Sequence, residues 1–133
     1  MKNFAYLVLG LLLVFSIAFA APVEMKTRTM DAKGSKVTIV HFGAPWCGPC
    51  VKMEPAMQAF ESSYKSKANM VMINVDEKGT PEYKKYSALV DKVGSIPFTV
   101  WLDSKGNSLG EKIGGLSEQE LASRTDAAAK KAK

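Results

Sequence analysis

The chain has 133 residues, of which 47% are hydrophobic and 23% charged, and these are the proportions of one ordinary globular domain. Its formal net charge of +5 comes from dispersed lysines without interleaved aromatic residues, a pattern that argues against nucleic-acid binding. The two cysteines and one histidine are too few for a four-ligand zinc site, so we expect no bound metal.

The first twenty residues differ in character from the rest of the chain. A short basic start precedes 18 uncharged residues from Phe4 onward, and an Ala-Phe-Ala triplet ends at Ala20. These features predict a signal peptide at 1–20, cleaved after Ala20, and a folded domain at 21–133. An uncleaved anchor is the alternative, because 18 apolar residues are close to the shortest stretch that spans a bilayer. In both cases the domain is periplasmic or secreted.

Two strands are predicted in the next part of the chain. Residues 23–30 alternate loosely between apolar and polar side chains, which predicts a first strand. A turn signal at 31–36 separates it from a second, buried strand at 37–42. The chain between 21 and 37 is too short to add a full helix, so we expect none there.

The two cysteines stand between this buried strand and a predicted helix. Apolar residues recur at helical spacing after them, which predicts a helix from Cys47 to Lys65 that Pro55 should bend. A Cys-x-x-Cys pair at such a junction is typical of thiol–disulfide exchange. Because a helix start favours a thiolate, we expect Cys47 to be the exposed attacking sulfur and Cys50 the buried resolving one.

Strands and helices also alternate in the rest of the chain. An apolar run predicts a parallel strand at 69–75, and Thr80 followed by proline predicts the start of a helix. Strands at 98–103 and 108–113 flank a Ser-Lys-Gly-Asn turn and predict a β-hairpin. A Ser-x-x-Glu capping box at Ser117 begins a final helix. This order predicts an α/β sandwich with a mixed sheet.

The cysteine motif is one of several segments of the chain that resemble the same known family. Trp46-Cys47-Gly48-Pro49-Cys50 resembles the active site of thioredoxin, and Pro55 matches the kink proline of its active-site helix. Ser95-Ile96-Pro97-Phe98 resembles the family's cis-proline loop, and Ile113-Gly114-Gly115-Leu116-Ser117 resembles its final loop. These matches run in the family's order between 37 and 121. The resemblance implies a thioredoxin-like three-layer sandwich, with helices on both faces of a mixed β-sheet, and no cofactor.

The resemblance also implies a role for each residue of the motif. Cys47 and Cys50 alternate between a dithiol and a Cys47–Cys50 disulfide, Gly48 lets a partner's backbone come close, and Pro49 stiffens the helix start. A purely structural disulfide is the alternative, but so short a loop would stabilise the fold very little. Trp46 is either a contact surface or a partly buried aromatic residue.

Two further loops are implied in substrate binding. Pro97 should follow a cis peptide bond and lie against the cysteines, and the backbone of Ile96 should pair with the substrate like an added strand. Gly114 and Gly115 belong to the final loop of the same surface. Without the resemblance, an ordinary proline at the start of a strand fits Pro97 equally well.

His41 departs from the family pattern. It stands where thioredoxin has a buried aspartate beneath the second cysteine, and Met72 stands where thioredoxin has the lysine that pairs with that aspartate. His41 is either a base that accepts the Cys50 proton with a pKa near 6.5, or a core histidine bonded to backbone. A protonated His41 would make the disulfide more oxidising. Gly43, where thioredoxin usually has tryptophan, should open space nearby.

The chain therefore predicts an exported thiol–disulfide oxidoreductase, a monomer that acts on protein disulfides or thiols and favours reduction. Its short opening resembles the hairpin that begins exported, membrane-associated thioredoxin-like proteins. A membrane dithiol relay is the expected electron donor, because cytoplasmic reductants do not cross the membrane. The alternatives are a disulfide-forming oxidant or isomerase and, from another class, a non-enzymatic module that carries copper(I) on the two thiolates.

Overall fold

The structure is a computed structural model that describes residues 24–132. The predicted signal peptide at 1–20 lies outside the described residues. Within residues 24–132, no helix is long and apolar enough to cross a membrane.

Five strands and three helices follow one another in the described chain. The strands are β1 (Arg28–Met30), β2 (Thr38–Gly43), β3 (Asn69–Asn74), β4 (Phe98–Leu102) and β5 (Ser108–Ile113). The helices are α1 (Gly48–Tyr64), α2 (Pro81–Val93) and α3 (Glu118–Lys131). The predicted order is confirmed, and most predicted bounds differ from the observed ones by one residue. The first strand is the exception, because it is only three residues long.

The strands form one mixed sheet in the order β1-β3-β2-β4-β5. β2 and β3 are parallel, and every other neighbouring pair is antiparallel. The predicted opening hairpin is wrong, because β1 pairs with β3 at the sheet edge and not with β2. The turn after β1 is held over β3 by a hydrogen bond of 2.7 Å from the Ala32 N–H to Asn69 Oδ1.

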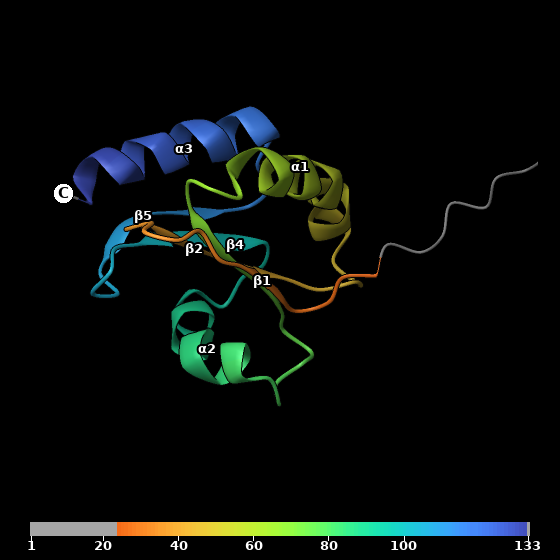
Figure 1. The fold of residues 1–133 in the computed structure, drawn as a ribbon. Helices are drawn as coiled ribbons and strands as arrows, with labels where there is room; N and C mark the ends of the chain where they lie inside the picture. Colours follow the sequence, from red (N-terminus) through yellow and green to blue (C-terminus); the bar gives the residue numbers. More distant parts are fainter. Residues whose placement is uncertain (1–23, 133) are drawn as a thin grey trace, which may run out of the picture.

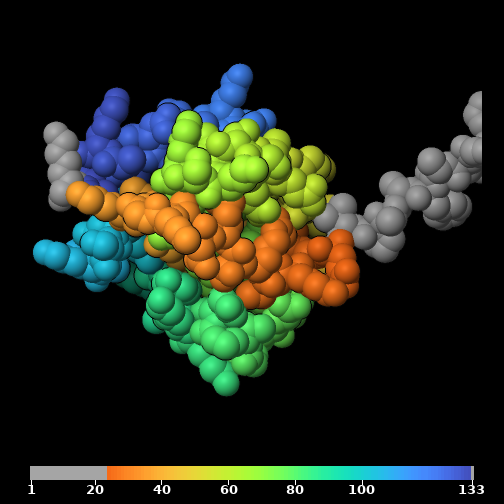
Figure 2. Space-filling view, in the orientation of Figure 1, coloured from red at the N-terminus to blue at the C-terminus, as the bar shows by residue number. Residues whose placement is uncertain are grey.

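The helices cover both faces of this sheet, which confirms the three-layer sandwich. α1 and α3 lie on one face and α2 on the other (Figure 1). Met57, Phe60 and Leu121 belong to the core under α1 and α3, whereas Phe42 and Phe98 belong to the core under α2. In Figure 2 the orange N-terminal part of the described chain crosses one side of the molecule between α1 and α2.

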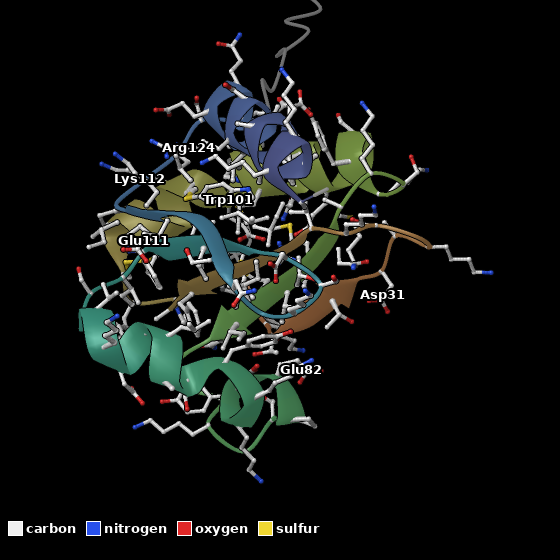
Figure 3. All side chains as sticks on the ribbon, turned by 90° about the vertical axis from the view of Figure 1, so that its left-hand side faces the viewer. Asp31, Glu82, Trp101, Glu111, Lys112 and Arg124 are labelled. Carbon is white, nitrogen blue, oxygen red and sulfur yellow. A yellow bond between two sulfur atoms is a disulfide. The ribbon has the colours of Figure 1, made fainter. Side chains whose placement is uncertain are left out.

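The final helix is fixed at its start and along its buried face. Ser117 and Glu120 form the predicted capping box, with the Ser117 Oγ accepting from the Glu120 N–H at 3.2 Å. Trp101 of β4 lies beneath α3, and its indole N–H donates to Thr125 Oγ1 at 2.9 Å. Arg124 lies over the Trp101 ring. The two residues are labelled close to one another in Figure 3. These contacts hold α3 on the sheet.

Candidate active site

The cysteine pair lies where β2 leads into α1. A short turn, closed by a hydrogen bond of 3.1 Å from the Cys47 N–H to the Ala44 carbonyl, joins the two elements. Cys47 is the N-cap of α1, and Cys50 lies in its first turn. The two residues form a disulfide with their Cα atoms 5.2 Å apart, so the predicted disulfide is confirmed.

Both cysteines are buried in this disulfide form. Cys47 is 6% exposed and Cys50 is 1% exposed. The prediction that Cys47 is exposed is therefore wrong here, although Cys47 is the less buried of the two. The reason is packing, because Met25 and Ala44 share a buried cluster with the cysteines and Ile96 packs against that cluster.

The start of α1 favours a negative charge on the first sulfur. With cysteine at the N-cap, no side chain of the described residues caps the first N–H groups. The first turn of α1 has no acidic side chain that would offset the positive end of the helix macrodipole. Pro49 stands in that turn, where a missing N–H costs nothing. Once the disulfide is reduced, this end of α1 favours the thiolate at Cys47.

Trp46 borders the disulfide as a surface residue. It is 68% exposed, and its indole N–H donates to Asp76 Oδ2 at 2.9 Å. This favours the contact-surface interpretation of Trp46. Gly48 is exposed beside it, and a Cβ there would meet open space, so another backbone can approach closely. A groove of about 430 Å³ runs from Trp46 toward α2, and the residues that line it include Val75, Asp76, Tyr83, Val90 and Ile96.

The loop before β4 lies against the loop after β5. The peptide bond between Ile96 and Pro97 is cis. The Gly114 N–H donates to the Pro97 carbonyl at 2.8 Å, and its φ of 94° is one that glycine adopts without strain. Ile96 packs against the cysteine cluster, while Gly115 is exposed next to Gly114. The structure therefore brings the cis-proline loop to the cysteines and the final loop to the cis-proline loop.

The family model for thioredoxin matches residues 23–127 of this chain. The chain belongs to the thioredoxin family. It is 36% identical over 96 residues to the thioredoxin-like protein HCF164, chloroplastic, of Arabidopsis thaliana, an alignment that covers 71% of this chain and 34% of the relative. It is 37% identical over 124 residues to the thiol:disulfide interchange protein TxlA homolog of Synechocystis, covering 79% of this chain and 66% of the relative. The chain thus spans about a third to two thirds of these relatives.

Shorter members of the family match over more of their own length. A thioredoxin of Pseudomonas aeruginosa is 34% identical over 96 residues, which cover 71% of this chain and 82% of the relative. Among solved structures, the germline-specific thioredoxin Deadhead of Drosophila melanogaster aligns with a TM-score of 0.54 and 28% identity. That alignment covers 70% of this chain and 81% of the Deadhead chain.

His41 is where the site departs from thioredoxin. The ring is buried, Nδ1 shares a hydrogen bond of 2.8 Å with Thr99 Oγ1, and Nε2 has no partner in the described part of the chain. Burial, and to a lesser extent the charge of Arg28, lowers the pKa of His41 to about 3. The predicted base with a pKa near 6.5 is therefore wrong, and so is the protonated, oxidising form. His41 is a neutral core histidine, bonded to a side chain instead of the backbone.

An ion pair that the sequence did not predict lies on the same face of the sheet. Met72, which replaces the lysine of thioredoxin, is the cross-strand neighbour of His41 on β2 and of Arg28 on β1. Arg28 Nη2 lies 2.7 Å from Glu54 Oε1 and 2.7 Å from Glu61 Oε1, both on α1. A positive charge thus reaches this face from the edge strand. The available signal was Glu54, an acid on the otherwise apolar face of the predicted helix.

Met25 fills the space beside Gly43, so the prediction that this space stays open is wrong. A Cβ at Gly43 would lie 3.0 Å from Met25 Sδ and 3.5 Å from both Cys50 Cβ and His41 Nε2. Met25 is buried among the cysteines, and Asn74 Nδ2 donates to its carbonyl oxygen at 3.0 Å. The N-terminal segment thus supplies the bulk that tryptophan usually provides in thioredoxin. No local pattern signals this contact, because the two residues are far apart in sequence.

Proposed function

We propose that the protein is an exported thiol–disulfide oxidoreductase that reduces disulfides in protein substrates through Cys47 and Cys50. One observation carries the proposal: the two cysteines form a disulfide at the uncapped start of α1. The exposed Trp46 and the loop of Ile96 and Pro97 support it, because they border the disulfide with surfaces that a protein substrate can contact. Membership of the thioredoxin family supports the same activity.

The reaction takes place in two exchange steps. In the reduced protein, the Cys47 thiolate attacks a substrate disulfide, forms a mixed disulfide and releases one substrate sulfur as a thiolate. Cys50 then loses its proton and attacks the Cys47 sulfur. The bond to the substrate breaks, the released substrate sulfur takes up a proton, and the Cys47–Cys50 disulfide remains. The substrate is reduced and the protein is oxidised by the same two electrons.

The cycle is completed by a protein partner that returns two electrons to the disulfide. Exchange between sulfurs needs no organic cofactor or metal. The uncharged segment from Phe4 and the small residues before Ala21 support export, and an exported protein needs a donor at the membrane. We assign this role to a membrane dithiol relay and expect the protein to act as a monomer. Export is tested by fractionating cells and sequencing the mature N-terminus, which should be Ala21.

Insulin reduction with dithiothreitol tests the activity. The wild-type protein should accelerate insulin reduction, and Cys47→Ser should abolish the acceleration. The direction is tested by equilibrating the protein with glutathione or dithiothreitol buffers. A potential of about −270 mV supports a reductant, whereas a potential of about −120 mV would make the protein a disulfide-forming oxidant instead.

The substrates can be captured with a Cys50→Ser variant. Without the second sulfur, the mixed disulfide at Cys47 cannot be resolved, so bound substrates stay attached and can be identified by mass spectrometry. A Cys47→Ser/Cys50→Ser variant is the matched control, because it should capture none of the same proteins. Equal capture by both variants would show that the attachment does not depend on Cys47.

A further inference from the structure

The donor atoms of Met25 and His41, and the carbon that carries the Cys50 sulfur, lie close to Gly43. The position that a Gly43 Cβ would take lies 3.0 Å from Met25 Sδ, 3.5 Å from His41 Nε2 and 3.5 Å from Cys50 Cβ. The remaining sulfur, that of Cys47, is bonded to Cys50 in the disulfide form. Thiolate and thioether sulfurs are the donors that select copper(I) in proteins.

We propose that the reduced protein binds one copper(I) ion through the sulfurs of Met25, Cys47 and Cys50. A dithiol such as dithiothreitol first reduces the disulfide and is itself oxidised to a cyclic disulfide. Binding then replaces the two thiol protons, which pass to the solvent, because the thiolate is the ligand. The disulfide form offers no thiolate and does not bind. This inference goes beyond the proposed function, since it gives the same cysteines a second ligand.

His41 is an independent feature that points to a ligand in this space. It is fully buried, and among the described residues its Nε2 has no hydrogen-bond partner. When Nδ1 donates to Thr99 Oγ1, Nε2 carries the free lone pair of the ring, and the position of a Gly43 Cβ lies 3.5 Å from this Nε2 and 3.0 Å from Met25 Sδ. A buried polar atom without a partner is unfavourable, so this nitrogen favours a ligand in the space that it borders. This nitrogen and the Met25 thioether therefore border the same space beside Gly43.

The Met25 thioether is what makes the cysteine pair a soft-metal site. Between residues 24 and 132, no three His, Cys, Asp or Glu side chains are placed to hold a metal ion. Met25 is fixed in position, because Asn74 Nδ2 donates to its carbonyl at 3.0 Å and the Asn74 N–H donates to Thr27 Oγ1 at 3.0 Å. Zinc is bound by cysteine, histidine and carboxylate ligands, so a thioether donor favours copper(I) over zinc.

A competition titration tests the site. Reduced wild-type protein, Met25→Leu and Met57→Leu are each titrated with copper(I) in the presence of the chromogenic chelator bicinchoninate. Met57→Leu is the matched control, because Met57 is equally buried but belongs to the main core and not to the cysteine cluster. The wild type should bind one ion per chain, Met25→Leu should bind about tenfold more weakly or worse, and Met57→Leu should match the wild type. Equal affinity in Met25→Leu and wild type would overturn the proposal.

X-ray absorption of the copper-loaded wild type decides the matter without a variant. Three sulfur neighbours per copper support the site, and two sulfur neighbours overturn it, even where Met25→Leu fails to fold. Insulin reduction by the wild type, measured in parallel without copper, keeps the two proposals separate. If the protein reduces insulin but its copper has only two sulfur neighbours, the metal proposal is wrong and the proposed oxidoreductase activity stands. If the copper has three sulfur neighbours but the protein does not reduce insulin, the proposed oxidoreductase activity is wrong and the metal proposal stands.

Discussion

The neutral state of His41 sets how the protein responds to acid. Burial and the charge of Arg28 lower the pKa of His41 to about 3 in the folded protein. In the unfolded chain the imidazole returns to a pKa of about 6.5. Between these two values the unfolded chain binds one more proton at His41 than the folded protein does. The free energy of unfolding must therefore decrease as the pH falls through this window.

Because of His41, we expect the free energy of unfolding to decrease by about 2 kcal/mol when the pH falls from 8 to 5. Above a pH of about 7, both states hold a neutral imidazole, so the contribution no longer changes. Urea unfolding of the wild type and of His41→Leu at the two pH values measures it. The variant has a different absolute stability, because Thr99 loses its partner, but its loss between pH 8 and pH 5 should be smaller by this amount. If His41→Leu loses as much stability between pH 8 and pH 5 as the wild type does, His41 is not the responsible group.

His41 should not act as a base for Cys50. A positioned general base contributes a factor of about 100 or more to a proton transfer, and an imidazole with so low a pKa is a poor proton acceptor. We expect His41→Leu to resolve mixed disulfides at a rate within about tenfold of wild type, with the same dependence on pH between 6 and 8. Rapid quenching of the mixed disulfide with a model peptide measures this rate. A loss that exceeds about 100-fold would restore the base.

At the scale of elements, the Arg28 ion pair fastens the edge strand β1 to the active-site helix α1. The Glu54 side chain is 2% exposed, and its charged partner is Arg28, whose Nη2 lies 2.7 Å from Glu54 Oε1. A buried carboxylate that loses its only charged partner is strongly destabilising, because its desolvation is no longer compensated. The pair therefore connects β1 to α1, in addition to the pairing of β1 with β3.

Arg28→Met should lower the free energy of unfolding by about 3 to 5 kcal/mol, because Glu54 remains buried without a counter-charge. The double variant Arg28→Met/Glu54→Leu should recover a large part of this loss, since no unpaired charge is left inside. Chemical unfolding of both variants measures the difference. Lys26→Met is the surface control, because Lys26 and its partner Glu24 are both mainly exposed, so this substitution should change the free energy of unfolding far less than Arg28→Met does. Equal losses at the two positions would contradict the argument.

Elements with a repeated pattern could be predicted from the sequence, and elements fixed by distant contacts could not. β5 and the Ser117 capping box follow from alternation and from a local motif, and both are found where expected. β1 is too short to show a period, and its pairing with β3 depends on Arg28 and on residues of other elements. At the site, the cysteine motif is contiguous and visible. The neutral state of His41 depends on burial, which a reference pKa does not include.

For the molecule as a whole, the N-terminal segment connects the disulfide to the far edge of the sheet. It begins beside the cysteines at Met25 and continues into β1, crossing the side of the molecule that Figure 2 shows in orange. The Thr27 N–H donates to Glu77 Oε2 at 2.9 Å, and Thr27 Oγ1 accepts from the Asn74 N–H at 3.0 Å. The segment that follows the predicted cleavage site therefore completes the cover of the active site.

A chain that begins at Arg28 should lose this cover, whereas a chain that begins at Ala21 should keep it. Deleting a buried methionine side chain costs about 2 to 5 kcal/mol, so Met25→Ala should be destabilised by that amount. The chain from Arg28 should lose still more, because the hydrogen bonds of Thr27 go as well. Urea unfolding ranks the stabilities of the chain from Ala21, the Met25→Ala variant and the chain from Arg28. The less stable a protein is, the faster dithiothreitol should reduce its disulfide. If the chain from Arg28 is as stable and as slowly reduced as the chain from Ala21, the segment does not cover the cysteines in solution.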